Sequence, residues 1–264
     1  MTEIPSGLGD VVLFEIIDHV AVVTLNRPEK RNAINAAIAS AVDYCVKKTE
    51  ADPEIRAVIL ASSNELAFCA GADLSEVART GGKGLATPDG GFAGLVNAPR
   101  RKPWIAAVRG SALGGGCELM LACDMAVVSD DVRIGLPEVK RNLLAAAGGI
   151  SRLPRSLPRA IALEMIATGE PIDASTARHH GLVNRVVPSA EVASAALDLA
   201  NAIAANGPLS VMASLDVARQ ALDLNDAELR KLTMTQSAAV TSSEDTKEGV
   251  QAFLEKRKPV WTGR

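Results

Sequence analysis

Aromatic side chains and surplus positive charge are both scarce in this sequence. Of its 264 residues 3% are aromatic, and 28 Lys and Arg stand against 31 Asp and Glu, which leaves a net charge of −3 at pH 7. Nucleic-acid-binding proteins need a basic surface, and those that bind single strands add aromatic rings on which bases stack. The composition therefore argues against nucleic acid as a partner.

Long apolar runs and targeting signals are also missing. No uninterrupted apolar stretch reaches the ~18 residues of a membrane-spanning helix. Residues 1–10, MTEIPSGLGD, carry an acid and a Pro where a signal peptide needs a basic end and an apolar run. We therefore expect a cytoplasmic protein that does not bind a membrane.

Metal-binding patterns are absent from the sequence as well. The cysteines form no CxxC pair of the kind that binds zinc. The adjacent His179 and His180 have no acid or Cys at ligand spacing, so we expect them on the surface. We predict no metal site, and the free thiols of a reducing compartment for Cys45, Cys69, Cys117 and Cys123.

Three common catalytic and cofactor motifs are not found either. The chain has no GxSxG nucleophile turn and no GxxxxGK[ST] phosphate loop. The glycines at 114–116 do not form the GxGxxG of a dinucleotide site. Serine-hydrolase, phosphate-loop and dinucleotide chemistry are therefore disfavoured.

Predicted strands alternate with predicted helices along the chain. The sequence is 48% hydrophobic, which is typical of a soluble globular protein. Apolar runs predict a hairpin at 11–17 and 20–26, turned at Asp18 and His19, and a buried strand at 55–62. Helical spacing predicts a helix from Ile34 to Val46. The cycle repeats with a strand at 103–110, a helix at 113–124 and strands at 125–130 and 132–135. This alternation predicts an α/β core of ββα-like units.

The remaining segments predict a glycine-rich loop and a helical C-terminal part. Five glycines between 81 and 91 make 77–99 either a mobile loop beside a cleft or a plain surface insertion. Residues 158–169 and 173–181 predict short helices, the second capped by Asp173 and ended by Gly181, and 181–187 predicts a last strand. Residues 189–256 are helical in pattern, with a break at 206–208. We expect a core over 1–195 and a helical unit over 196–264.

Two turns made of small residues each open a helix, at FCAGADL (68–74) and ALGGGCEL (112–119). A helix N-terminus leaves N–H groups without intrahelical partners, and small residues let a ligand approach them closely. Two such ends that face each other form the donor pair that an oxyanion or enolate needs. The candidate donors are the amides of Ala72 and Gly115. The alternative is that these glycines serve tight packing only.

Two acids lie near the second turn. Glu118 comes three residues after Gly115 in an otherwise apolar run, and Glu138 follows a strand and a Pro. Two carboxylates at one cleft of low dielectric constant push their pKa values apart, so that one holds a proton while the other accepts one. That pairing suits the addition or removal of water. Otherwise, Glu118 lies on the polar side of its helix and Glu138 is an ordinary loop acid.

These stretches together resemble the crotonase (enoyl-CoA hydratase/isomerase) superfamily. The resemblance is carried by VVTLNRPEKRNAIN, AFCAGADL, WIAAVRGSALGGGCELMLACD, IGLPEV and GLVNRVV, and it extends from about residue 11 to the C-terminal EGVQAFLEKRKPVWTGR. It implies a spiral of ββα units followed by a helical trimerisation region, in a homotrimer or dimer of trimers. It also implies an acyl-CoA thioester substrate and no metal or redox cofactor.

The resemblance also assigns roles to residues. It implies that Ala72 and Gly115 hold the thioester oxygen, and that Glu118 and Glu138 are the two catalytic glutamates of the hydratase members. Lys256 and Arg257, in the C-terminal EKRKP, match a segment brought toward a neighbour's CoA, unless they form a solvated tail. The substrate contacts it implies are Lys30, Arg31, Ala33, Ala70, Asp73, Leu74, Gly114 and Pro137.

One segment departs from the family pattern. After the second Glu the family usually has G-x-x-P-G-x-G-G, but residues 142–149 are NLLAAAGG. Asn142 is tolerable if its backbone is left-handed, and Ala145 and Ala146 replace a Pro and a Gly beside Glu138. Enoyl-CoA hydratase is the expected activity. A carnitinyl-CoA-like dehydratase, a Δ3–Δ2 enoyl-CoA isomerase and a non-catalytic acyl-CoA-binding protein stay open as alternatives.

Overall fold

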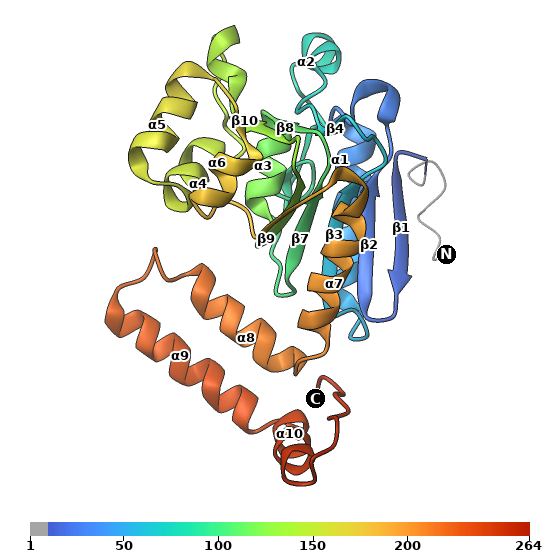
Figure 1. Cartoon of the computed structure of the whole chain (residues 1–264), viewed down its shortest axis with the longest axis vertical. Helices are drawn as coiled ribbons and strands as arrows, with labels where there is room; N and C mark the ends of the chain where they lie inside the picture. Colours follow the sequence, from blue (N-terminus) through green and yellow to red (C-terminus); the bar gives the residue numbers. More distant parts are fainter. Residues whose placement is uncertain (1–9) are drawn as a thin grey trace.

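Two β-sheets form the centre of the structure, a computed structural model that describes residues 10–264 (Figure 1). The larger sheet has the strand order β1 (Val12–Ile17), β2 (Val20–Leu25), β3 (Ala57–Ser62), β7 (Trp104–Val108), β9 (Met125–Ser129), β12 (Arg185–Val187). The smaller sheet has the order β11 (Ile172–Asp173), β10 (Arg133–Gly135), β8 (Ser111–Leu113), β4 (Ala67–Cys69). Residues 1–9, on which the expectation of no signal peptide rests, lie outside the described residues.

The chain visits the two sheets alternately. β3 in the larger sheet leads to β4 in the smaller one and then to α2 (Leu74–Thr80), and β7 and β8 lead in the same way to α3 (Gly115–Ala122). β9 and β10 lead through the 3-10 helix η2 (Pro137–Arg141) to α4 (Gly149–Ser156). Neighbouring strands of successive units pair in parallel, which requires a crossover between them. The predicted α/β core of ββα units is confirmed.

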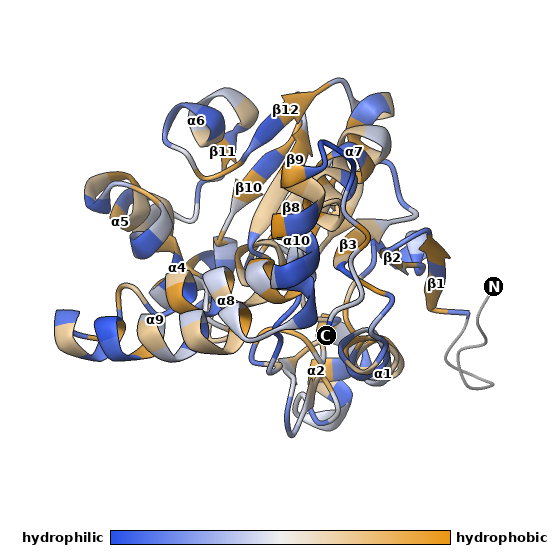
Figure 2. Ribbon diagram, turned by 90° about the horizontal axis from the view of Figure 1, so that it is seen from below, coloured by the Kyte–Doolittle hydropathy of each residue, from blue (hydrophilic) through white to orange (hydrophobic). Residues whose placement is uncertain are grey.

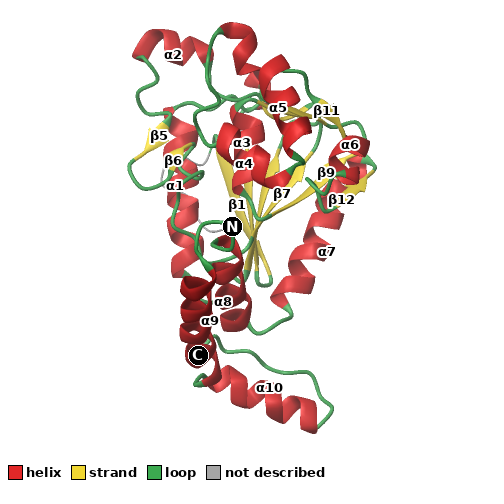
Figure 3. Ribbon diagram, turned by 90° about the vertical axis from the view of Figure 1, so that its left-hand side faces the viewer, coloured by secondary structure: helices red, strands yellow, loops and turns green. Residues whose placement is uncertain are grey.

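Helices cover both faces of the larger sheet. Figure 3 shows α1 (Ala36–Ala51) and α7 (Val192–Ala204) on opposite sides of the strands. One face packs with α1 through Ile38, Val42 and Cys45, and the other packs with α7. Much of β3 and β9 is hydrophobic in Figure 2, as expected for parallel strands buried on both faces.

The start of α1 lies two residues later than the pattern predicted. Ile34 forms a parallel β-bridge with Ala72, so its backbone is extended rather than helical. Asn35 is the N-cap, and its side chain accepts a hydrogen bond from the amide of Ile38. The bridge also ties the loop before α1 to the first of the two small-residue turns.

Turns make up most of the segment 77–99, which was predicted as a loop, but it also contains regular structure. It contains the end of α2 and a hairpin of β5 (Ala86–Thr87) and β6 (Gly91–Phe92). Several of its glycines serve close packing, and a Cβ on Gly94 would lie 2.3 Å from the carbonyl oxygen of Ala39 in α1. Because that contact is with a helix more than 40 residues earlier, local sequence patterns could not reveal it. The buried residues of the segment are Leu85, Gly90, Ala93, Gly94, Leu95 and Val96.

Helices predicted for the middle of the chain are present, with one addition. α5 (Arg159–Thr168) and α6 (Ala174–His179) match the two expected helices, and the carboxylate of Asp173 accepts from the amide of Thr176 as a cap. The last strand is limited to 185–187, and α4 was not predicted. Its sequence contains Gly149 and Pro154, which are poor helix formers, so packing rather than propensity decides it.

The C-terminal helices α8 (Pro208–Arg219), α9 (Asp226–Thr241) and α10 (Glu244–Leu254) lie apart from the two sheets at one end of the molecule (Figure 1). The expected boundary between residues 195 and 196 falls inside α7, and α7 packs on the sheet through Ala196, Ala200 and Ala204. Large apolar side chains remain exposed here, at Leu222, Met234, Val250, Phe253 and Leu254.

The last residues of the chain form hydrogen bonds with α10 and with Arg56, which precedes β3. The carboxylate of Asp245 accepts from the amides of Thr262 and Gly263, and Arg56 donates to the carbonyl of Trp261. Within residues 10–264, none of the helices combines the length and the apolar character that crossing a membrane requires.

We expect Ala200→Leu to destabilise the protein. Ala200 is fully buried between α7 and the larger sheet, so added methylenes must displace neighbours, at about 1–3 kcal/mol of unfolding free energy. Urea denaturation followed by circular dichroism measures the change. Ala202→Leu, at an exposed position of the same helix, is the control. Equal stability of the two variants would contradict the packing of α7 on the sheet.

Candidate active site

Three parallel strands of the smaller sheet end at one edge. β4 and β10 both pair in parallel with β8, so their carboxyl ends and that of β8 point the same way. The turn at Ala72 follows β4, Gly114 and Gly115 follow β8, and Glu138 follows β10. Sheet topology therefore brings together residues that are up to 66 positions apart in the sequence.

The two small-residue turns touch each other. Gly71 has a φ of +90°, and a Cβ built on it would lie 2.9 Å from the amide nitrogen of Gly115. A Cβ on Gly116 would lie 2.0 Å from the carbonyl oxygen of Cys69. Side chains at either position would force the backbones apart. The sequence left two alternatives for these glycines, tight packing or the placement of amide donors. The glycines pack tightly at the contact beside which the amides of Ala72 and Gly115 lie.

The amides of Ala72 and Gly115 donate no hydrogen bond to any other part of residues 10–264. Their neighbours do, since Ala70 donates to the carbonyl of Arg31 and Asp73 to that of Ile34. Both Ala72 and Gly115 line one cavity of about 750 Å³. Two such donors at one cavity can stabilise an oxygen on which negative charge develops.

The same cavity is lined by Glu118 and Glu138 and by most of the expected substrate contacts. Five of those contacts line it, and Lys30, Ala33 and Asp73 do not. The expectation that these three bind substrate stays a prediction without support from the cavity. The five that line it are Arg31, Ala70, Leu74, Gly114 and Pro137.

Glu118 lies in the first turn of α3 with 4% of its surface exposed. Its Oε1 accepts a hydrogen bond of 2.9 Å from the amide of Gly149. Burial raises the pKa of its carboxyl and the nearby Glu138 adds to this, whereas the amides of Gly149 and Ala147 and the charge of Arg152 act in the opposite direction. The pKa of Glu118 is raised overall, because burial is the largest influence and the hydrogen bonds and the charge of Arg152 offset only part of it.

Glu138 lies in the first turn of η2, next to Gly114. A Cβ on Gly114 would be 3.0 Å from Oε1 of Glu138, and Oε2 is buried without a hydrogen-bond partner among the described residues. Burial raises the pKa of this carboxyl, and its own backbone amide and Arg141 offset only part of the effect. An unpartnered buried oxygen favours the protonated form, so the two acids differ in their surroundings.

Asp73 has a structural position rather than a place in the cavity wall. Its carboxylate caps α2 by accepting from the amides of Ser75 and Glu76, and it forms a 2.7 Å ion pair with Arg27. The hydrogen bonds from Ser75 and Arg27 hold the pKa of this carboxyl well below its usual range. Asp73 therefore fixes the turn that carries the amide of Ala72.

Asn32 was not singled out from the sequence, although it organises the loop beside this turn. It is fully buried with a φ of +52°, and its side chain donates to Ser62 and to the carbonyl of Phe68 while accepting from the amide of Arg27. The sequence offered no signal for this role, because an Asn in a polar loop is unremarkable without its distant partners.

Two segments to which the sequence assigned no substrate contact also line the cavity, the β5–β6 segment and the stretch 142–149. Leu85 and Phe92 line it from the β5–β6 segment, so that segment does lie beside a cleft. The ring of Phe92 packs on Gly115, where a Cβ would be 2.7 Å away. Leu143 and Leu144, in the stretch that departs from the family pattern, line it as well, and Asn142 has the left-handed φ of +54° that its position needs.

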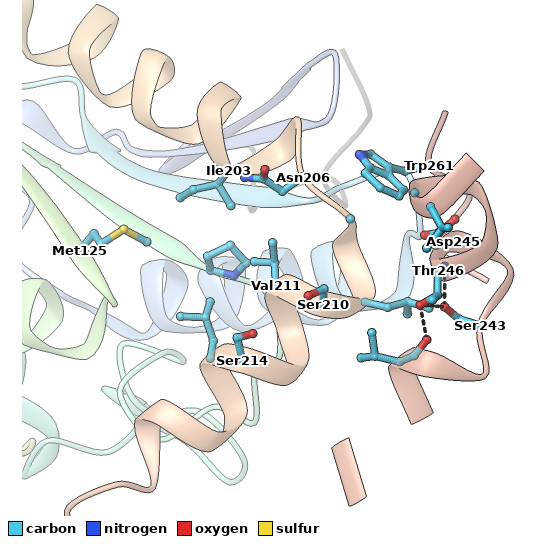
Figure 4. Close-up of a pocket in the computed structure, with 17 residues that line it drawn as sticks. Met125, Ile203, Asn206, Ser210, Val211, Ser214, Ser243, Asp245, Thr246 and Trp261 are labelled. Carbon is cyan, nitrogen blue, oxygen red and sulfur yellow. Dashed lines mark hydrogen bonds between the residues drawn. The ribbon is translucent and has the colours of Figure 1, made fainter. Parts of the chain in front are cut away.

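A second cavity, of about 730 Å³, lies between α8, α10 and the end of α7 (Figure 4). Its lining is mostly apolar, with Trp261 on one side, and its one acid is Asp245. That carboxylate is already bound by the C-terminal residues. Because it has no second acid among the described residues, this cavity is a poor candidate for chemistry that needs both a general acid and a general base.

The four cysteines and all possible metal ligands in residues 10–264 can be compared with the predictions from the sequence. All four cysteines are free, as predicted, and burial raises the pKa of Cys69 to about 12. Among residues 10–264, no three His, Cys, Asp or Glu side chains gather closely enough to hold a metal ion.

We expect Glu138→Gln to raise the melting temperature at about pH 7 and to lose this effect toward about pH 4, near the pKa of a free glutamate. The folded-state pKa of Glu138 is raised, so ionisation opposes folding once the pH exceeds the unfolded-state pKa, and stability falls as the pH rises through this window. Calorimetry at both pH values measures the change. Glu15→Gln, on the exposed side of β1, is the control. If Glu138→Gln instead melts at a lower temperature than the wild type at about pH 7, the argument that ionised Glu138 opposes folding is contradicted.

Comparison with known proteins agrees with this geometry. The family model described as enoyl-CoA hydratase/isomerase matches residues 15–264. The structure of an enoyl-CoA hydratase from Mycobacterium tuberculosis H37Rv superposes with a TM-score of 0.93 at 39% identity, covering 97% of this chain and 100% of that one. A carnitinyl-CoA hydratase from Mycobacterium avium has a TM-score of 0.77 at 45% identity, covering 97% and 99%.

A further relative extends the comparison to a dehydratase. A carnitinyl-CoA dehydratase from Proteus mirabilis is 39% identical over 247 residues, which are 92% of this chain and 94% of its own. The family match covers nearly the whole chain, including the C-terminal helices. The chain therefore belongs to the enoyl-CoA hydratase/isomerase family.

Proposed function

We propose that this chain is an enoyl-CoA hydratase, a lyase that adds water reversibly to a 2-enoyl-CoA thioester and forms a 3-hydroxyacyl-CoA. The observation that carries the proposal is a single cavity lined by two amides that have no partner within residues 10–264 and by two carboxyls whose pKa values burial raises. Hydration requires this set, because it needs a base, an acid and a stabilised enolate oxygen.

The surroundings of the two acids suggest which one is the base. Glu118 accepts from the amide of Gly149, which supports its carboxylate, and it takes a proton from the water that attacks C3. Charge develops on the thioester oxygen, where the amides of Ala72 and Gly115 bind it. Glu138, whose Oε2 has no hydrogen-bond partner in the part of the chain that the structure describes, gives its proton to C2. The reverse sequence removes water.

The reaction involves only proton transfers and charge stabilisation, so we propose that no metal or redox cofactor takes part. General acid–base catalysis contributes roughly 10²–10⁴-fold, and loss of one oxyanion donor costs about 10²–10³-fold. Arg31, which lines the cavity and is exposed, is placed to meet a polar part of CoA. Four free thiols, three of them buried, fit a reducing compartment, and we place the protein in the cytoplasm.

A carnitinyl-CoA-like dehydratase is the second candidate, because relatives described by that substrate are as similar as the hydratases. The cavity wall favours a neutral acyl group instead. A quaternary ammonium is usually held by several aromatic faces. Phe92 is the single aromatic side chain among the residues that line this cavity in the described chain. The neighbouring wall is aliphatic, with Val77, Leu85, Leu143 and Leu144.

We expect the protein to hydrate crotonyl-CoA, with kcat lowered at least 10²-fold in both Glu118→Gln and Glu138→Gln. Loss of absorbance at the enoyl-thioester band measures the rate. Glu65→Gln, an exposed glutamate outside the cavity lining, is the control and should match the wild type.

Other outcomes distinguish the alternatives. Preferred turnover of carnitinyl-CoA would favour the dehydratase. Isomerisation of a 3-enoyl-CoA that survives Glu118→Gln would favour the isomerase, since that reaction needs one acid. Binding of acyl-CoA without turnover of any of these substrates would leave a non-catalytic protein.

We further propose that the protein is a homotrimer or a dimer of trimers assembled through the predicted C-terminal unit, 196–264. Phe253 is 82% exposed and Leu254 is 71% exposed on α10, and an apolar surface of this kind is typical of an interface. Covering it with another copy removes it from water.

Phe253→Asp is therefore expected to lower the solution mass toward that of a monomer, because a charge at the centre of an interface must be desolvated. Light scattering coupled to size-exclusion chromatography measures the mass. Lys247→Ser, at an exposed position of the same helix, should leave it unchanged. A monomeric wild type would contradict the proposed assembly.

A further inference from the structure

Arg152 connects two walls of the catalytic cavity. It extends from α4, and its Nη1 donates a 3.0 Å hydrogen bond to the carbonyl of Ala147 while its Nη2 donates to the carbonyl of Val96. Ala147 lines the cavity, and Val96 closely follows Phe92, which also lines it. One planar guanidinium thus joins the segment after η2 to the β5–β6 segment.

The segment that Arg152 binds is also the one that binds Glu118. The amide of Gly149 donates to Oε1 of Glu118, two residues after the carbonyl that Arg152 holds. Between them lies Gly148, with a φ of +104°, where a Cβ would be 1.9 Å from Nη1 of Arg152. The guanidinium therefore lies directly against the backbone that orients the carboxylate.

We propose that Arg152 is a positioning residue for Glu118, which holds residues 147–149 in the conformation that directs the Gly149 amide at the carboxylate and supplies a fixed positive charge beside it. The description of Glu118 as the catalytic base rests on the function proposed above. The placement of the guanidinium and its contacts does not depend on that function.

Charged and titratable groups face Glu118 from several elements. Glu138 in η2 raises its pKa and Arg152 in α4 lowers it, while Cys117 beside it on α3 is a buried neutral thiol. Arg152 itself faces Arg100 as well as Glu118. A guanidinium keeps its proton in proteins, so Arg152 contributes a permanent charge. Without that charge, burial and Glu138 would hold the proton on Glu118 to higher pH.

Two substitutions separate the charge from the two-pronged hydrogen bond. Arg152→Lys keeps the charge but cannot bind both carbonyls in one plane, and Arg152→Gln removes the charge. The matched control is Arg155→Gln on the same helix, because Arg155 is exposed and pairs with Asp223 outside the cavity. Thermal unfolding of each variant establishes that it is folded.

The first measurement is a titration of the Glu118 side-chain carbon by NMR in the ligand-free full chain, with Glu118→Gln identifying the signal. We expect Arg152→Gln to raise the pKa of Glu118, and Arg152→Lys and Arg155→Gln to leave it unchanged. The second is hydration of crotonyl-CoA. We expect Arg152→Lys to lower kcat roughly tenfold with little change in KM, because a misplaced base affects the chemical step.

An unchanged Glu118 pKa in Arg152→Gln would overturn the charge role, and a wild-type kcat in Arg152→Lys would overturn the positioning role. If Arg152→Gln does not fold, the kcat of Arg152→Lys still decides the positioning role, which rests on the two hydrogen bonds of the guanidinium. A wild type that hydrates no enoyl-CoA would instead refute the proposed function. The titration would still show whether the charge of Arg152 lowers the pKa of Glu118.

Discussion

The close approach of two backbones, at Gly71 and Gly115, is the constraint on which the candidate site depends. The parallel pairing of β4 and β8 sets the distance between the strand ends, and the absence of side chains on Gly71, Gly115 and Gly116 lets the two turns meet. Any Cβ there would lie within 3 Å of a neighbouring atom. The amides of Ala72 and Gly115 reach one cavity because of this contact, and they remain available because no other group in the described chain accepts from them.

The acids are held to this contact by different means, and their surroundings differ for that reason. Glu118 belongs to the helix that begins at the contact, so its carboxyl lies one turn away, where the amide of Gly149 can bind it. Glu138 follows β10, the strand that pairs with β8 in the same sheet, and its carboxyl lies against Gly114. One carboxyl has a donor and the other has an oxygen without one. A base and an acid can thus arise from two identical side chains.

The outer wall of the cavity depends on contacts that span the chain. The β5–β6 segment is fixed by α1, where Gly94 packs on the backbone of Ala39 and Thr87 donates to Asp43. Arg152 then joins the end of that segment to residues 147–149. Substitutions at 143, 144, 146 or 147 therefore change the outer wall of the cavity, whereas the amides of Ala72 and Gly115 are placed by the smaller sheet.

The sequence by itself determined the repeating ββα order, the two small-residue turns and the two acids, because strand and helix periodicities and glycine requirements are local properties. Tertiary structure decided which of the implied contacts reach the cavity. Asp73 is engaged by Arg27, 46 residues away, and Lys30 and Ala33 lie outside the cavity lining. It also decided that the glycine-rich stretch packs on α1 and includes a short hairpin, that α7 belongs to the layer on the larger sheet, and that Arg152 binds the segment whose amide binds Glu118. These outcomes depend on atoms far apart in the chain, and their distances are set only when the sheets form.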